Sequence, residues 1–508
     1  MAELSDVSRE ILERLRRLRE ADAATHGGRV LSYVYDSGLA ELDELSAEAM
    51  RLVQPVNGLD PTAFPSVAAL ERDVVGFARQ MLHGDADTVG SVTSGGTESC
   101  MLAVKTARDV WAAAQVSGDP ATQPMLALRP RIIAPATVHA AFHKAAHYFG
   151  LDLDLVPVDA TGQVDVNDLR ARFGPDVALV VVSAPSYPFG VLDPIADVAS
   201  AAAHHGIPCH VDACIGGFAL AWWGDDLPPW DLAVPGVTSI SADLHKYGYA
   251  PKGASVLLQR DRDRQRQQFF ATARWPGYPV VNATLLGSKS AGALAAAWAI
   301  VQRLGSEGFA ELVSSCRRST EKLHTRIDDI VGLRVVGSPT GPLLAVETDA
   351  TVPKRSRVDP HHWADRVSEL GFTLQLQPGF TQSNGLTLPH TTHLTITPVT
   401  ERMLPELTAA LTQAADDVRG KARATPRFAV QALRMSGALG RELTADKAQA
   451  LLSRFGVGAN PGNASSASTP LPAKMAPLIA LVEQLPSEFA ERLLIEVLAR
   501  QVEPPTAP

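Results

Sequence analysis

Short hydrophobic runs, rich in β-branched residues, alternate with helix-like segments through the middle of the chain. The runs lie at 131–134, 153–158, 177–183, 207–213, 237–242 and 254–259. Apolar runs of this length, with helical segments between them, are typical of strands that are buried on both faces. The pattern predicts an α/β fold in which helices cover both sides of a mostly parallel central sheet.

The pattern changes toward both ends of the chain. Residues 5–20 repeat leucine and isoleucine at helical spacing, which predicts an amphipathic arm of the kind that often packs on a partner subunit. After an alanine-rich helix at 288–303, a smaller α/β unit is predicted, with strands within 333–347, 372–377 and 393–397 and helices at 306–330, 360–370 and 400–418. A further amphipathic helix is predicted near 475–502.

These changes divide the chain into four predicted parts. They are an N-terminal helical arm (1–57), a large domain (58–305), a small C-terminal domain (306–424) and a helical extension (425–508) with a flexible linker near 456–474. A chain of 508 residues is long enough for several units of ordinary domain size. We expect the extension to serve an interaction.

Composition narrows the class of protein. Hydrophobic residues make up 46% and charged residues 20%, which is typical of a globular chain. The net charge is −9 and no long basic run occurs, so binding to nucleic acid is not expected. No apolar stretch reaches the roughly 18–20 residues of a transmembrane helix. Four cysteines are too few for a disulfide framework, which predicts a reducing cytoplasm.

The segment 239–255, SISADLHKYGYAPKGAS, carries the most informative lysine. A predicted strand ends directly before it, so Lys246 is expected at the carboxyl edge of the sheet, where open α/β folds build their sites. A lysine among aromatic neighbours such as Tyr247 and Tyr249 loses its proton more easily and can then form a Schiff base with an aldehyde. The alternative is a solvated loop lysine.

A carboxylate is predicted at the same edge. Asp212 ends the strand 207–213 and precedes ACIGGF. Such a carboxylate can hold a proton on a pyridine nitrogen, which makes the ring an electron sink. A helix-capping aspartate is an equally good interpretation of this residue alone.

A glycine-rich segment, SVTSGGTES at 91–99, lies between a predicted strand and a helix. Its Gly95, Gly96 and Thr97 predict a phosphate cradle, because backbone N–H groups at a helix start bind anions. The segment is neither a Walker motif nor GxGxxG, so it favours a compact phosphate ester over ATP or a dinucleotide.

Three histidines follow another strand, in TVHAAFHKAAH at 137–147. His139 opens this segment and is placed to lay its ring on an aromatic ring. His139, His143 and His147 share one predicted helical face, which is compatible with a metal site. No acidic residue lies among them and HExxH is absent, so we predict no metal.

Five phrases in register carry a family resemblance. They are VTSGGTES, TVHAAFHKAA, SAPSYPFGVLDPI, HVDACIGGF and SADLHKYGYAPKG. In this order they resemble the fold type I pyridoxal-phosphate enzymes, and within them the group II decarboxylase and sphingosine-1-phosphate lyase branch. The resemblance spans roughly residues 50–420. It implies a PLP-dependent transferase-like fold and pyridoxal 5'-phosphate as the cofactor.

The resemblance also implies roles for the cofactor-binding residues. Lys246 is expected to form the Schiff base, Asp212 to pair with the pyridinium nitrogen and His139 to stack on the ring. The phosphate is expected on the residues Gly95, Gly96, Thr97 and His245. Ser288 is expected to approach from the neighbouring subunit, which together with the amphipathic arm predicts a homodimer with shared active sites.

Two further residues are implied in the reaction. Lys252, in the APKG turn, is expected to act as acid or base, and Tyr187 to lie beside the substrate. The predicted reaction is retro-aldol cleavage of a phosphorylated amino alcohol, a small-molecule amine, to an aldehyde and an amine. Asp60 and Lys289 replace a His and an Arg of the resembled motifs, which weakens the prediction of a phosphosphingoid substrate. The alternative is an amino-acid decarboxylase, and a third is a cofactor-binding scaffold without turnover.

Overall fold

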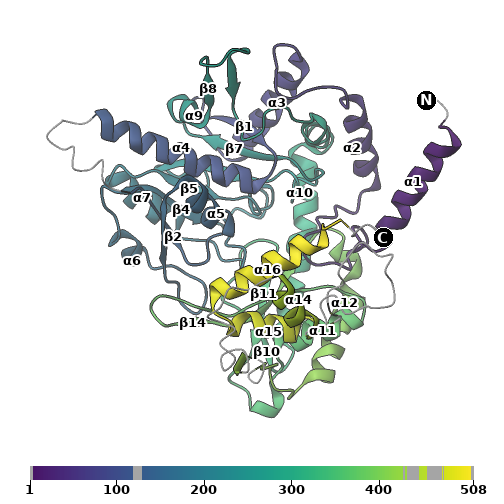
Figure 1. Ribbon diagram of the computed structural model, residues 1–508. Helices are drawn as coiled ribbons and strands as arrows, with labels where there is room; N and C mark the ends of the chain where they lie inside the picture. The colour runs from purple at the N-terminus through teal and green to yellow at the C-terminus, as the bar shows by residue number, and fades with distance from the viewer. Residues whose placement is uncertain are drawn as a thin grey trace.

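The computed structural model describes residues 4–117, 129–426, 430–431, 445–454, 472 and 474–504. Most of the predicted linker at 456–474 lies outside these residues. Figure 1 shows a larger lobe that contains the main sheet above a smaller lobe, with helix α1 projecting to one side.

The larger lobe contains a sheet of seven strands in the order β1-β7-β6-β5-β4-β2-β3. Their bounds are β1 (Val89–Thr93), β2 (Arg131–Pro135), β3 (Asp152–Val156), β4 (Val177–Ser183), β5 (Cys209–Asp212), β6 (Val237–Ala242) and β7 (Ser255–Gln259). All neighbouring pairs are parallel except those of β7, which is antiparallel to both β1 and β6. The predicted mostly parallel sheet is confirmed.

Helices cover both faces of this sheet because successive strand residues point to opposite sides. Ile132 of β2 packs in the cluster of α4 (Gly96–Ser117) and α5 (Ala140–Phe149), whereas Ile133 packs in the cluster of α3 (Pro65–Met81) and α7 (Ile195–His204). The described part of this lobe also contains the helices α6 (Val166–Arg170), α8 (Gly217–Leu220) and α9 (Arg262–Gln268) and a hairpin of β8 (Phe270–Thr272) and β9 (Val280–Asn282).

Helix α10 (Gly292–Asp328) joins the two lobes. It bends at Gly305, whose φ of 52° lies outside the helical region, at the end of the predicted large domain. Glycine adopts a positive φ at little cost, which makes it suited to this bend. The alanine-rich helix and the predicted helix at 306–330 are thus one element with a kink.

The smaller lobe is built on an antiparallel sheet in the order β10-β11-β15-β12. The strands are β10 (Leu333–Val335), β11 (Leu343–Thr348), β12 (Gln375–Gln377) and β15 (Thr391–Thr395), and the helices packed on them are α11 (Pro360–Glu369) and α12 (Thr400–Val418). A short hairpin of β13 (Phe380–Thr381) and β14 (Thr387–Leu388) accompanies them.

The N-terminal region has two different environments. Helix α1 (Asp6–Arg19) buries none of its residues. The segment after it packs on the small lobe, where the Leu31 N–H donates to Thr373 O at 2.9 Å and Val30 pairs with Thr373. Helix α2 (Ala40–Leu52) then packs against α10.

The described residues of the C-terminal extension form helices, but the prediction of one long helix at its end is wrong. The expected single helix near 475–502 is two helices, α15 (Ala476–Gln484) and α16 (Ser487–Gln501), after α14 (Ala445–Arg454). Pro486 separates them, because proline lacks the N–H that a helix interior needs. Asp365 accepts hydrogen bonds from Met475 N and Ala476 N, which anchors the start of α15 on α11. Within the described ranges, no helix is both long and apolar enough to cross a bilayer.

Candidate active site

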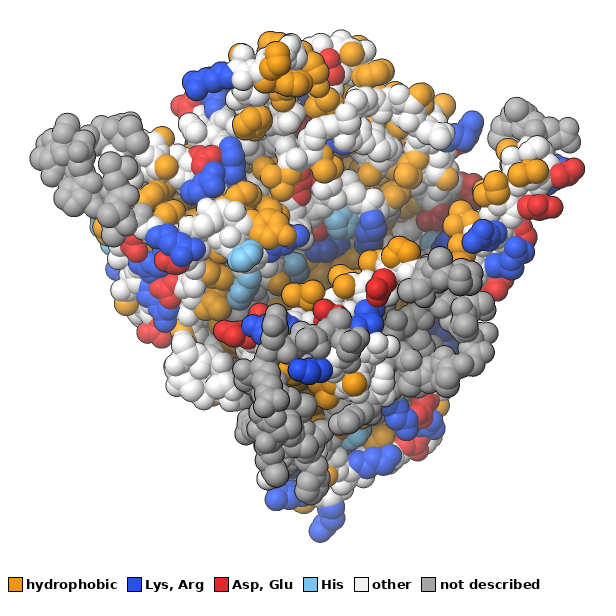
Figure 2. All heavy atoms as spheres, viewed as in Figure 1, with side chains coloured by type: hydrophobic (Ala, Val, Ile, Leu, Met, Phe, Trp, Pro, Cys, Tyr) orange, Lys and Arg blue, Asp and Glu red, His pale blue; other side chains and the backbone are white. Residues whose placement is uncertain are grey.

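A cavity of about 360 Å³ lies at the carboxyl ends of the parallel strands. Eight of the predicted site residues line it together, namely Gly95, Gly96, Thr97, His139, Tyr187, Asp212, His245 and Lys246. Asp212 is the last residue of β5, and the others lie in the segments after β1, β2, β4 and β6, as the strand-end rule for open α/β sheets predicts. Figure 2 shows a hollow in the middle of the molecule that contains cationic and histidine side chains and has hydrophobic side chains along its lower edge.

Lys246 points its amine at a buried acid. Its Nζ lies 3.0 Å from Oδ2 of Asp243, whose side chain is only 1% exposed. Burial works to lower the pKa of Lys246, but the charge of Asp243 outweighs burial, so this pKa is raised. Lys246 is therefore an ammonium when no aldehyde is bound to it, and the expectation that it loses its proton more easily is wrong, because sequence reasoning missed the charge of Asp243.

Asp212 is buried at the end of β5. It accepts a hydrogen bond from Cys214 N at 3.0 Å and does not cap helix α8, whose N-cap is Gly216. Burial works to raise the pKa of Asp212, whereas His139 and the hydrogen bonds from Cys214 lower it, and the result is a lowered pKa. Asp212 is thus an ionised carboxylate that faces the cavity, beside the thiols of Cys100 and Cys214, which lie 3.8 Å apart.

The glycine segment forms the start of α4. Gly96 is the first residue of the helix, so its first N–H groups are free of helical partners in the way that favours anion binding. A Cβ at Gly96 would lie 2.6 Å from Asp243 Oδ2 and 2.9 Å from Cys214 Sγ, which only glycine avoids. Glu98 braces the turn by accepting hydrogen bonds from both N and Oγ of Ser94.

His139 does not lie on a helical face with His143 and His147. It is the N-cap of α5, and its Nδ1 accepts a hydrogen bond from Ala141 N at 3.2 Å. The sequence pattern placed the helix start too early, since a histidine can cap a helix in extended conformation. Burial lowers the pKa of His139, which favours the neutral ring.

Tyr187 forms the wall of the cavity toward the small lobe. Its hydroxyl donates to Oε1 of Gln375 on β12, and Nε2 of Gln375 donates to the Tyr33 hydroxyl at 2.8 Å. Its ring stacks on that of His393 with centroids 4.4 Å apart. Burial raises the pKa of Tyr187, so its hydroxyl keeps its proton.

Lys252 and Ser288 do not line this cavity. Lys252 lines an adjoining pocket of about 310 Å³, donates to His245 O at 3.0 Å and lies over the ring of Tyr35. Burial and the charge of Lys246 lower the pKa of Lys252 to about 8. Ser288 accepts a hydrogen bond from Asn57 Nδ2 at 3.2 Å.

Sequence reasoning missed several residues of the site. Asp243, Cys100 and Cys214 line the cavity, and Gln375 contacts it through Tyr187. Only Asp243 had a usable signal, since an acid three residues before Lys246 reaches the same turn. Gln375 lies 188 residues from Tyr187, and no local pattern connects the two.

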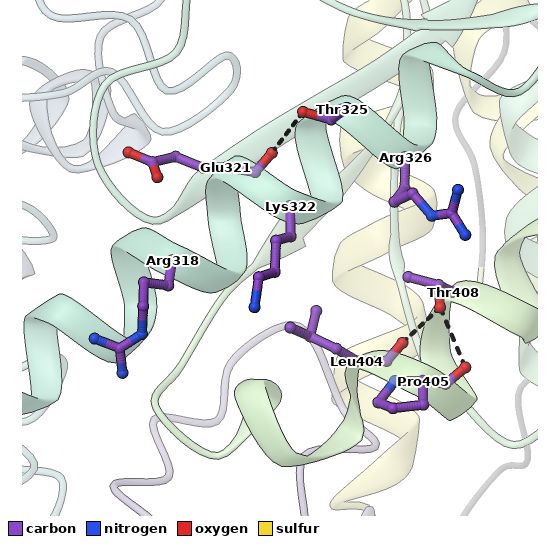
Figure 3. Close-up of a pocket in the computed structure, with 8 residues that line it drawn as sticks. All are labelled: Arg318, Glu321, Lys322, Thr325, Arg326, Leu404, Pro405 and Thr408. Atoms are coloured by element: carbon purple, nitrogen blue, oxygen red, sulfur yellow. Dashed lines mark hydrogen bonds between the residues drawn. The ribbon is translucent and has the colours of Figure 1, made fainter.

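A separate groove of about 500 Å³ lies between α10 and α12 (Figure 3). Three cations follow one side of α10 there, Arg318, Lys322 and Arg326. Arg318 is paired with Glu401 at 2.7 Å. None of the predicted site residues lines this groove, so it takes no part in the site.

The comparisons with known proteins agree with this geometry. The family model "Pyridoxal-dependent decarboxylase conserved domain" matches residues 25–343, and "Pyridoxal-dependent enzyme, C-terminal putative HTH domain" matches residues 405–500. The chain therefore belongs to the pyridoxal-dependent decarboxylase family. The cofactor of this family is pyridoxal 5'-phosphate.

Within the family, the chain is similar to sphingosine-1-phosphate lyases. It is 37% identical to sphingosine-1-phosphate lyase 1 of Rattus norvegicus over 66% of this chain and 58% of that protein. The corresponding values for the Arabidopsis thaliana lyase are 34%, 79% and 72%. The chain thus spans less than two thirds of the length of the rat relative.

Solved structures of related proteins have the same fold as this chain. The sphingosine-1-phosphate lyase of Burkholderia pseudomallei has a TM-score of 0.73 at 32% identity, and the match covers 86% of this chain and 96% of that one. The glutamate decarboxylase of Lactobacillus brevis, at 21% identity and a TM-score of 0.70 over 83% and 95% of the two chains, shares the fold.

The residues present fit pyridoxal phosphate. Lys246 offers an amine, Asp212 an ionised carboxylate, and Gly96 a cradle in which a Cβ would collide. In the described part of the chain, the buried Nδ1 of His245 has no hydrogen-bond partner, so it is available to a phosphate beside Gly95. The predicted fold class and cofactor are confirmed.

Proposed function

We propose that this protein is a pyridoxal-phosphate-dependent carbon–carbon lyase. Its substrate would be a phosphorylated amino alcohol, which it cleaves between the carbons that carry the amine and the hydroxyl to give an aldehyde and an amine. The observation that carries this proposal is the convergence of Lys246, Asp212, His139 and the α4 glycine cradle on one cavity. The similarity to sphingosine-1-phosphate lyases supports the choice of bond.

Residues that line the cavity are proposed to bind different parts of the cofactor. Pyridoxal phosphate, when bound, supplies an electron sink for the pair of electrons left by the broken bond. Lys246 would hold the cofactor, and Asp212 would keep a proton on the ring nitrogen because its own pKa is lowered. The ring of His139 would contact the cofactor ring, and Gly95, Gly96, Thr97 and His245 would bind its phosphate.

Lys252 is proposed as the base that takes the substrate's hydroxyl proton. With a pKa of about 8, it is partly neutral near physiological pH, whereas an ordinary lysine is almost wholly charged. Tyr187 is proposed to contact the substrate, held by Gln375 and by His393 beneath its ring.

Amino-acid decarboxylation is the second candidate, and the description of the matching family model favours it. The two activities share every cofactor-binding residue and differ in the bond that is aligned for cleavage. Offering the purified protein a sphingoid phosphate and a panel of amino acids separates them. A long-chain aldehyde supports the lyase, and evolved carbon dioxide supports the decarboxylase.

The covalent link to the cofactor can be tested directly. We expect the isolated protein to be yellow and to retain the cofactor after borohydride reduction, because reduction turns the link into a stable amine. Lys246→Ala should abolish this retention, while the exposed-lysine variant Lys144→Gln should keep it. A colourless wild type that takes up no pyridoxal phosphate would refute the proposal.

We further propose a cytoplasmic homodimer with shared active sites. Helix α1 exposes Val7, Ile11 and Leu15 at 65%, 63% and 53%, as expected of a helix that packs on a partner. Ser288 lies away from the cavity of its own chain and is proposed to complete that of the neighbour. The four cysteines are buried and free, which suits a reducing compartment.

A further inference from the structure

Asp243 is a buried acid that lines the active-site cavity and is not among the residues predicted to bind the cofactor. It follows β6, and its backbone N–H donates to Cys214 O at 3.1 Å. One carboxylate oxygen, Oδ2, lies 3.0 Å from Lys246 Nζ and 3.5 Å from His245 Nε2. Its side chain is 1% exposed and lines the cavity.

The carboxylate of Asp243 differs from other buried acids in its hydrogen bonding. Among the residues that the structure describes, neither Oδ1 nor Oδ2 has a hydrogen-bond partner. The space above it is kept open by Gly96, since a Cβ there would lie 2.6 Å from Oδ2. Asp243 therefore differs from Asp193, whose buried carboxylate accepts a hydrogen bond from Ser183 N at 2.7 Å.

A buried carboxylate without such bonds requires a positive neighbour, because an uncompensated buried charge is costly. The two nitrogens near Asp243 belong to Lys246 and His245. Burial lowers the pKa of His245, which favours its neutral form. The nitrogen of Lys246 is closer and is the group that carries the compensating charge.

The same requirement holds after the cofactor has been bound. When Lys246 is joined to the cofactor aldehyde, its nitrogen has two possible forms. It carries one proton and a positive charge, or it carries no proton and is neutral. Loss of that proton would leave Asp243 buried beside a neutral nitrogen. The charge balance of the cavity therefore favours the protonated link, which is also the form that a substrate amine attacks more readily.

We propose that Asp243 is a positioning residue whose carboxylate keeps the nitrogen of Lys246 protonated, both as the free amine and when it is joined to the cofactor. Asp212 would then stabilise the proton on the ring nitrogen, and Asp243 would stabilise the proton on the nitrogen of Lys246. The proposal rests on the covalent link that the proposed function requires, but not on which bond of the substrate is cleaved.

The other titratable groups around Lys246 do not replace Asp243. Tyr35 and Cys214 are neutral, since burial raises the pKa of Tyr35 to about 12 and the pKa of Cys214 is also raised. Lys252 is a cation only in its protonated form, in which it would oppose a positive charge on the Lys246 nitrogen. The remaining neighbours are His139, Cys100, Tyr187 and Asp212. Asp212 is the anion among these four, and its charge raises the pKa of Lys246 less than that of Asp243 does.

The test is a spectrophotometric pH titration of the full chain loaded with pyridoxal phosphate, because the protonated and unprotonated links absorb at different wavelengths. Asp243→Asn removes the charge and keeps the shape. We expect the pH at which half of the links are protonated, the midpoint of the titration, to fall by about one pH unit or more. This is about a tenfold change in the ratio of the two forms at fixed pH. Asp87→Asn, which removes an exposed charge from the same lobe, should leave the midpoint unchanged.

An Asp243→Asn midpoint equal to that of the wild type would overturn the inference. If this variant does not bind the cofactor, His245→Gln decides the question at saturating cofactor. A wild-type midpoint in that variant supports Asp243, and a fall of about one unit assigns the effect to His245 and overturns the inference. A wild type without any cofactor absorbance would instead refute the proposed function, so the two failures are distinguishable.

Discussion

At the scale of single residues, neighbouring groups shift the pKa values of two nearby lysines in opposite directions. Lys246 and Lys252 are six positions apart, yet the pKa of the first is raised by Asp243 and that of the second is lowered to about 8 by burial and by the charge of Lys246. If neutral Lys252 accepts the substrate's proton, kcat should rise as pH increases through about 8, because the neutral fraction grows above the pKa.

Lys252→Gln is expected to remove this rising limb and to lower kcat by about 10²-fold or more. Lys144→Gln changes an exposed lysine of the same lobe and should keep the wild-type profile. A Lys252→Gln variant with the same limb would show that another group is the base. A limb that falls through pH 8 in the wild type would make Lys252 the acid.

At the scale of elements, the start of α4 fits the cofactor only because three segments meet there. Gly96→Ala would place a Cβ against both Asp243 and Cys214, at 2.6 and 2.9 Å. We expect this overpacking to destabilise the protein by about 1–3 kcal/mol and to weaken cofactor binding at least about tenfold. Thermal unfolding and a pyridoxal-phosphate titration measure the two effects.

Gly76→Ala is the matched control for this change. Gly76 lies within helix α3, and a Cβ there meets nothing within 4 Å. Alanine should stabilise the helix by about 0.5–1 kcal/mol without changing cofactor affinity. Equal cofactor affinities of Gly96→Ala and the wild type would mean that the cradle tolerates a side chain.

At the scale of the whole molecule, the exposed face of α1 and the position of Ser288 are the two features that support the proposed second subunit. Replacing Ile11 and Leu15 by Glu should convert the dimer into monomers and abolish activity, because charges on an apolar interface are costly to bury. Sedimentation and activity assays check this. Glu10→Gln on the polar side of the same helix should change neither, and a fully active monomeric wild type would contradict the prediction.

Sharing of the site has its own test. A Lys246→Ala chain keeps Ser288 but has no active lysine, and a Ser288→Trp chain keeps Lys246 but blocks the neighbour's site. Mixed dimers of two such chains contain one intact site, so a one-to-one mixture should regain about a quarter of the sites. No recovery after subunit exchange would place Ser288 outside the neighbour's site.

Local pattern predicted the elements well where one rule applied throughout. Buried apolar runs marked β2, β4, β5 and β6, and polar residues directly after them marked the site, because parallel strands end at one edge. The pattern did not show that β7 runs antiparallel, since a buried run has the same composition in either direction. It also overlooked the break at Pro486, although proline was visible.

The sequence by itself determined which groups the proposed chemistry can use: an amine, an acid, an imidazole and a glycine cradle, each near the end of a strand and in an order that a known family shares. Only the tertiary structure decided how these groups affect one another. Oδ2 of the buried Asp243 lies 3.0 Å from Nζ of Lys246, and Gln375 of the smaller lobe accepts a hydrogen bond from the Tyr187 hydroxyl. Charge and hydrogen bonding depend on distance and burial, and neither is encoded by spacing along the chain.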